Sequence, residues 1–141
     1  MGAWLGKIGR WRSSPRVAVA VEAACLAPAL ALLVLGASAW GGYFMLAHEL
    51  QLVADDALAA AVAELDVENR ERSAWAEAER HLTRHGGLAP DAMRLSVMAQ
   101  PRQLTIMVVY DASRSPVFAF ARLMPMPSPT IVRSASGRLD S

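Results

Sequence analysis

One acidic side chain, Glu22, lies near the start of a long apolar stretch, where an unpaired charge is costly. Residues 17–47 are otherwise uncharged, and the 25 residues from Ala23 to Ala47 contain no ionisable group other than Cys25 and Tyr43. A helix over this stretch would be roughly 37 Å long, which exceeds the roughly 30 Å of a bilayer hydrocarbon core. A carboxylate at the edge of such a span is expected to have a partner, so Glu22 is the first candidate for function.

A second group of ionisable side chains follows helical spacing. Glu77, His81 and His85 are each four residues apart, with His48 as a distant fourth donor. Imidazole groups one turn apart can bind zinc. The segment is rich in arginine, however, and has neither a cysteine nor the H-E-x-x-H pattern, so a solvated helix face is the favoured interpretation and no metal site is predicted.

No other constellation indicates catalysis. Asp55 and Asp56 are adjacent, so their side chains diverge on a helix and are expected on its solvated face. The sequence contains no nucleophile motif and no glycine-rich phosphate loop. We therefore predict a protein that is not an enzyme, with no catalytic residue and no cofactor.

The charges on either side of the apolar stretch predict its orientation in a membrane. Residues 1–16 contain no acid and four bases, namely Lys7, Arg10, Arg12 and Arg16. Positive residues mark the cytoplasmic side, so the amino terminus is predicted inside and the carboxy terminus outside. These bases lack interleaved stacking aromatics, so they are interpreted as topology determinants and nucleic acid is not an expected partner. The predicted organisation is a cytoplasmic basic arm (1–16), a transmembrane helix (17–47) and an extracytoplasmic domain (48–141).

Several residues within the span would shape its packing. Pro28 removes a backbone donor from the helix interior, which predicts a kink. Ala37 with Gly41, and Ser38 with Gly42, place small residues four apart. Such pairs let a second helix approach closely in a membrane.

The helix is predicted to continue beyond the span to about Leu65, with one apolar face. The positions of this face are Leu46, Leu50, Val53, Ala57 and Ala60. A second helix is predicted from Glu68 to about His85, with Trp75, Ala78 and Leu82 on one face, ended by Gly86-Gly87.

The rest of the chain is predicted to form strands. Alternating apolar and β-branched residues indicate strands at 93–99, 104–110, 117–123 and 130–135, and residues 100–103 suit a hairpin loop. The predicted fold class is α+β: a long amino-terminal transmembrane helix that extends into a domain with a second helix and a small antiparallel sheet.

The amino-terminal third resembles the TadE-like proteins, which are pseudopilin-like proteins of Tad (Flp-type) pilus assembly. The residues that carry the resemblance are the box Val19-Ala20-Val21-Glu22, the proline six residues later at Pro28, and the apolar continuation Ala29–Leu35. The resemblance implies a single-pass protein of the cytoplasmic membrane that takes part in assembling an adhesive pilus. Its implied partners are membrane lipid, other pilins or minor pilins, pilus-assembly platform proteins and a prepilin peptidase.

The resemblance also implies a processing step and a role for the acid. A prepilin peptidase would cut between Val17 and Ala18, and Glu22 would become the fifth residue of the mature chain. Its carboxylate would then pair with the terminal amine of a neighbouring subunit. The chain departs from the family pattern at Val17, where glycine is usual, and at Ala23, where an aromatic is usual. Cleavage at this bond is therefore left open.

Two other interpretations remain open. Ala37-Ser38-Ala39 resembles a signal-peptidase site, and cleavage after Ala39 would release residues 40–141 as a soluble exported domain. The chain could instead be a single-pass membrane protein with no role in pili, in which Glu22 is a tolerated residue at the membrane edge.

Overall fold

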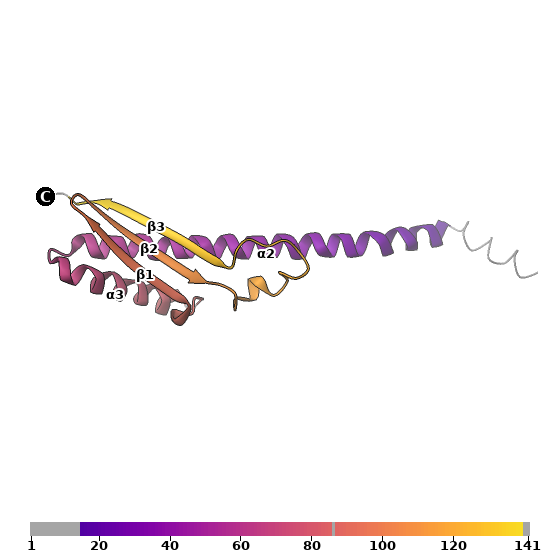
Figure 1. The fold of residues 1–141 in the computed structure, drawn as a ribbon. Coiled ribbons are helices and arrows are strands. Elements are labelled where there is room, and N and C mark those ends of the chain that lie inside the picture. The colour runs from indigo at the N-terminus through magenta and orange to yellow at the C-terminus, as the bar shows by residue number, and fades with distance from the viewer. Residues whose placement is uncertain (1–14, 86, 140–141) are drawn as a thin grey trace, which may run out of the picture. The chain divides into compact units, whose positions relative to one another are not determined.

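The computed structural model describes residues 15–85 and 87–139. A long helix α2 (Pro15–Ala63) is followed by a second helix α3 (Val67–His85) and three strands, β1 (Met93–Gln100), β2 (Gln103–Asp111) and β3 (Thr130–Arg138) (Figure 1). Two short 3-10 helices, η1 (Pro90–Ala92) and η2 (Pro116–Phe118), lie in the connections. The predicted α+β class is confirmed.

The chain divides into two units, residues 1–38 and residues 39–141. Within the first unit, the described residues 15–38 all belong to α2, and its large apolar side chains are exposed, among them Val21, Leu26, Leu30 and Leu33. A helix that is apolar all round requires an apolar environment. Of the helices described, only α2 is long and apolar enough to cross a membrane. The helix runs through Pro28 without interruption, and the kink predicted there stays a prediction.

The second unit contains an antiparallel sheet with the order β1-β2-β3. β1 and β2 form a hairpin, with Gln100 opposite Gln103 and Pro101-Arg102 as its turn. β2 and β3 pair along their whole length, from Gln103 opposite Arg138 to Asp111 opposite Thr130. The strands predicted at 93–99, 104–110 and 130–135 are confirmed, and β3 continues three residues further than predicted because β2 provides partners that far.

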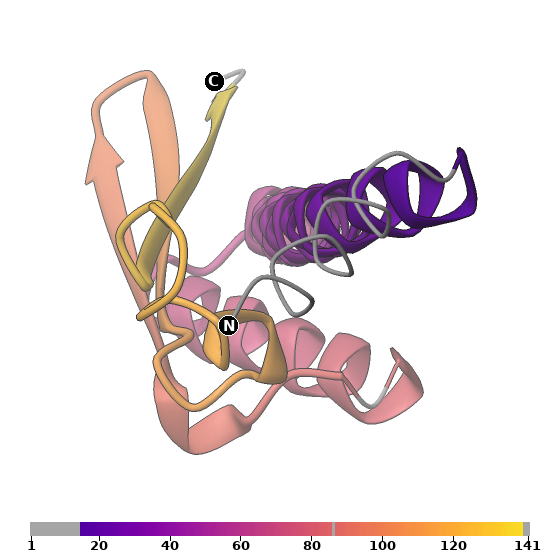
Figure 2. The same ribbon diagram turned by 90° about the vertical axis from the view of Figure 1, so that its right-hand side faces the viewer.

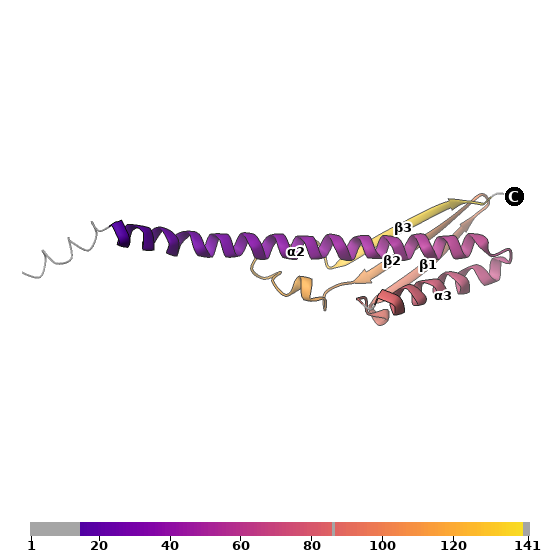
Figure 3. The ribbon, with the colours of Figure 1, turned by 180° about the vertical axis from the view of Figure 1, so that it is seen from behind.

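One face of the sheet forms the core. The alternating residues Leu104, Ile106, Val108 and Tyr110 of β2 are buried, and the residues between them are only half-buried. α3 and residues 39–63 of α2 lie on the same side of the sheet, as an end-on view shows (Figure 2). The view from behind Figure 1 shows the same helices α2 and α3 beside the three strands (Figure 3). The unit is therefore a two-layer α+β structure with one covered and one open sheet face.

The buried face of α2 follows the predicted spacing at first. Leu46, Leu50, Val53 and Ala57 are buried as predicted, but the next buried residue is Ala61, and Ala60 is half-buried. One helical turn contains about 3.6 residues, so a residue three positions on and a residue four positions on both lie close to the same face. After Ala57 the buried position is therefore Ala61, four residues on, and not Ala60, three residues on.

The buried face of α3 is also offset from the prediction. Ala74, Ala78 and Leu82 are buried, whereas Trp75 keeps 37% of its surface exposed. The small alanines and Leu82 belong to the buried core, and the larger indole of Trp75 stays partly exposed. Asp66 precedes α3 and caps it, since its carboxylate accepts from the backbone N–H of Glu68 at 3.1 Å.

The strand predicted at 117–123 is wrong. This segment contains η2 and a series of turns instead. The hydroxyl of Ser115 accepts from the N–H of Val117, and its carbonyl accepts from the N–H of Phe118 at 3.0 Å. The segment thereby satisfies its backbone locally, and β3 pairs directly with β2.

Leu50→Ala is expected to destabilise the folded unit by about 2–5 kcal/mol, because it removes a fully buried side chain from between the helices and the sheet. Leu65→Ala is the matched control, since Leu65 is 96% exposed and should change stability by less than about 0.5 kcal/mol. Chemical denaturation of the full chain in detergent, followed by circular dichroism, measures both. Equal effects would contradict the assigned core.

Candidate functional site on helix α2

Glu22 lies on α2 in an exposed apolar environment. The neighbouring side chains Val19, Val21 and Leu26 are each about 60% exposed or more. Within residues 15–85 and 87–139, no cation lies in ion-pair range of the Glu22 carboxylate. Arg16, although it is only six residues away in the sequence, is also out of range. The pairing hypothesis therefore requires that Glu22 pair with a cation from outside the described residues.

The bond between Val17 and Ala18 lies near the start of α2. Ala18 is exposed, and the side chain of Val17 lies outside the described part of the structure, as do all of residues 1–14 of the predicted basic arm. Pro15, the first residue of α2 as described, is a residue type favoured at this position.

The small residues predicted to accept another helix fall into two groups. Ala37 and Gly41 are exposed, and an added Cβ at Gly41 would meet nothing within 4 Å. Ser38 is also exposed, but its hydroxyl donates to the carbonyl of Val34 in the preceding turn at 2.8 Å. These residues are open to contact by another molecule.

Gly42 differs from the other three because its own chain already packs against it. A Cβ at Gly42 would lie 3.0 Å from Cγ2 of Val117, which belongs to η2. The close approach that sequence reasoning assigned to a second helix is made at this position by the segment between β2 and β3. Sequence alone offered no signal for this contact, because the two residues are distant in the chain.

Four aromatic rings lie together next to Gly42. Tyr43 is 6.4 Å from Trp40, 5.9 Å from Phe44 and 6.3 Å from Phe118, measured between ring centroids. The rings of Tyr43 and Phe118 meet edge to face. We call Trp40, Tyr43, Phe44 and Phe118 the aromatic cluster. Tryptophan and tyrosine at the end of a membrane span are a recognisable interface signal in the sequence, but the participation of Phe118 is not.

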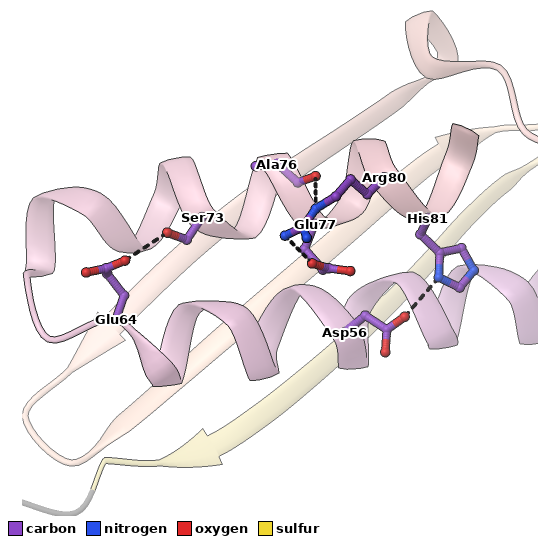
Figure 4. Close-up of polar contacts among 7 residues, drawn as sticks. All are labelled: Asp56, Glu64, Ser73, Ala76, Glu77, Arg80 and His81. Carbon is purple, nitrogen blue, oxygen red and sulfur yellow. Dashed lines mark hydrogen bonds and ion pairs between the residues drawn. The ribbon is translucent and has the colours of Figure 1, made fainter. Parts of the chain in front are cut away.

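The histidine and acid candidates separate in the structure. His81 is buried, with 6% of its surface exposed, and its Nδ1 is 2.9 Å from the carboxylate of Asp56 on α2 (Figure 4). Glu77 instead pairs with Arg80 on the same helix. The side chain of His85 lies outside the described residues, and His48 is exposed.

The solvated-face interpretation is therefore wrong for His81, whose bond to Asp56 ties α3 to α2. A second hydrogen bond, of 3.1 Å, joins Ser73 of α3 to Glu64, the residue that directly follows α2. The solvated-face interpretation is incomplete for Asp56, which is half exposed but has His81 as its partner. No group of three or more potential metal ligands occurs among the residues that the structure describes. The arrangement is that of an interhelical tie.

No family model, curated protein or solved structure matches this chain.

Gly41→Ala and Gly42→Ala should separate in their effects. Both gain up to about 1 kcal/mol of helix propensity, and at Gly41 nothing opposes the gain. At Gly42 the new methyl group presses on Val117, so this variant should be less stable than Gly41→Ala by about 1–3 kcal/mol. Thermal unfolding of both full-length variants in detergent measures the difference. Identical stabilities would contradict the contact between Gly42 and η2.

Proposed function

We propose that this chain is a membrane-anchored, pseudopilin-like protein of the TadE-like type, which takes part in assembling a Tad-type adhesive pilus. In this role it is not an enzyme. It is a single-pass protein of the cytoplasmic membrane with its amino terminus inside, and its partners are other pilins and assembly-platform proteins. The observation that carries the proposal is one acid, Glu22, on an exposed apolar helix that continues into a folded α+β unit.

The physical basis of the role is the cost of the Glu22 charge in an apolar environment. Attraction between opposite charges is several times stronger in a protein or lipid interior than in water, and a carboxylate without a partner is penalised there. A cation supplied by a neighbouring subunit at the matching depth would remove this penalty. The pairing would therefore select one register of two packed helices.

The exposed residues after Glu22 supply the remaining contact surface. Leu26, Leu30 and Leu33 are exposed on α2, and Ala37 and Gly41 offer positions where a second helix can approach closely. Packing of these side chains provides affinity between helices, and Glu22 provides the alignment.

A released exported domain is the second candidate, and one observation favours it. The large buried core of residues 39–141 begins at Leu46, so a chain that starts at Trp40 keeps every residue of that core. Cleavage after Ala39 would thus leave a domain able to fold.

The mass of the mature protein from its native host distinguishes these candidates. A chain that begins at Ala18 is the expected result for pilin-type processing, and an intact chain would identify an uncleaved membrane anchor that can still serve as an assembly subunit. A chain that begins at Trp40 would reject the pilin proposal, because such a chain lacks Glu22. Intact-protein mass spectrometry of membrane and secreted fractions reads out the three masses directly.

Glu22→Gln should reduce surface pili by about tenfold or more, because it keeps the side chain's size and removes the charge that pairs, and a tenfold loss corresponds to about 1.4 kcal/mol. The amount of protein in the membrane fraction should not change. Glu49→Gln, in the same helix but beyond the apolar stretch, is the matched control and should leave piliation normal. Normal pili in the Glu22→Gln strain, counted by electron microscopy, would contradict the proposed role.

A further inference from the structure

The segment between β2 and β3, residues 112–129, is unusually apolar for a surface connection. It contains two phenylalanines, a valine, a leucine and two methionines, and its only charged residues are Arg114 and Arg122. Leu123 is 70% exposed and Phe120 is 37% exposed. Phe118, Met124 and Met126 line a groove of about 500 Å³ beside Arg122. Long connections of this kind are uncommon and are usually functional.

The segment presents these side chains from an ordered backbone. The N–H of Ala112 donates to the carbonyl of Pro129 at 2.9 Å and closes the loop at its base. Further turns follow inside it, including the N–H of Leu123 to the carbonyl of Phe120 at 2.9 Å. At its entrance, the backbone N–H of Ser113 donates to Asp111, and this bond lowers the pKa of the carboxyl. The exposed side chain of Leu123 is thus held by a loop whose backbone is closed by hydrogen bonds.

Contacts within residues 39–141 fix the loop next to one part of α2. Val117 packs against Gly42, and the ring of Phe118 packs against Tyr43. Gly42 and Tyr43 lie near the carboxyl end of the uncharged stretch, a few residues before His48 and Glu49. In a membrane-spanning helix this is the level of the outer headgroups, where tryptophan and tyrosine are enriched. The loop is therefore held at interface depth.

We infer that residues 112–129 form a second membrane contact, in which Phe120 and Leu123 enter the outer surface of a phospholipid bilayer. The lipid surface is favoured as the occupant because the loop is continuous with the aromatic cluster at the end of the span. Both charges in the loop are positive, which suits headgroup phosphates. The inference rests on the membrane anchorage within the proposed function and does not depend on a role in pili.

Spin labels on the full-length protein test the contact. In a Cys25→Ala background, Leu123→Cys carries a nitroxide, and the protein is reconstituted in vesicles of phosphatidylcholine and phosphatidylglycerol. Leu65→Cys is the matched control, since it is an exposed leucine beyond the far end of α2. Power saturation compares the accessibility of each label to oxygen, which enters lipid, and to a water-soluble nickel chelate. The oxygen-to-nickel ratio should be several-fold higher at residue 123 than at residue 65.

Two results would overturn the inference. A label at residue 123 that is as accessible to nickel as the label at residue 65 would place the loop in water. Spin–spin broadening at residue 123 that disappears on dilution with unlabelled protein would show that a second copy of the chain covers the loop. Neither result would alter the Glu22→Gln outcome, so failure of this inference is distinct from failure of the pilus role.

A matched pair of variants tests whether the positive charge of Arg122 contributes to the membrane contact. Arg122→Glu should lower the oxygen-to-nickel ratio at residue 123 in vesicles that contain phosphatidylglycerol, because it replaces attraction to anionic headgroups with repulsion. Arg102→Glu, in the hairpin turn at the opposite end of β2, should leave the ratio unchanged. Equal ratios in the two variants would remove the headgroup contact assigned to Arg122.

Discussion

The structure depends on one continuous helix whose two parts require different environments. Along α2, exposed apolar side chains such as Leu30 and Leu33 give way to a one-sided buried face that begins at Leu46. The first pattern is stable only where the surroundings are apolar, and the second only where a sheet covers one side. The change between them, near residues 39–46, therefore sets where the folded unit must begin and which chain segments can lie beside it.

The contacts that hold the sheet to α2 begin directly after residues 39–46, where the buried face of the helix starts. Arg133 of β3 donates to the carbonyl of Ala47 at 3.2 Å, and Gln51 donates to the carbonyl of Ser134 at 3.3 Å. Further along the helix, Leu58 and Val62 lie close to Gly137. β3 thus follows α2 from the end of the uncharged stretch to the end of the helix. Because β3 begins beside this part of α2, the loop that precedes β3 lies next to Gly42. The apolar loop is therefore found at the level where a membrane surface is expected.

Local patterns were sufficient to predict both helices and three strands. The uncharged stretch and the alternation in β2 each act through neighbouring residues, so they are readable in the sequence. Gly86 of the predicted helix stop lies outside the described residues. The predictions that were wrong concern residues whose burial or secondary structure depends on a partner far away in the sequence. His81 is buried because Asp56 and the core cover it, and residues 117–123 avoid the sheet because β3 pairs with β2.

The candidate site shows the same division. The position of Glu22 in an apolar run was visible in the sequence, and so were the small residues near the end of that run. The use of Gly42 for contact within the chain was not, since it depends on Val117, which is far away in sequence. Periodicity identifies which side of a helix is special, but only the folded chain shows what occupies that side.

The depth of Glu22 limits what its charge can contribute. An acid at the edge of a membrane costs much less than one at the centre, so the free energy recovered by pairing is correspondingly small. Such a pair is suited to choosing a register between helices that already associate through other contacts. The exposed face from Leu26 to Gly41 offers a much larger contact area. In the proposed assembly, affinity therefore comes from this face, and Glu22 discriminates against neighbours packed at the wrong height.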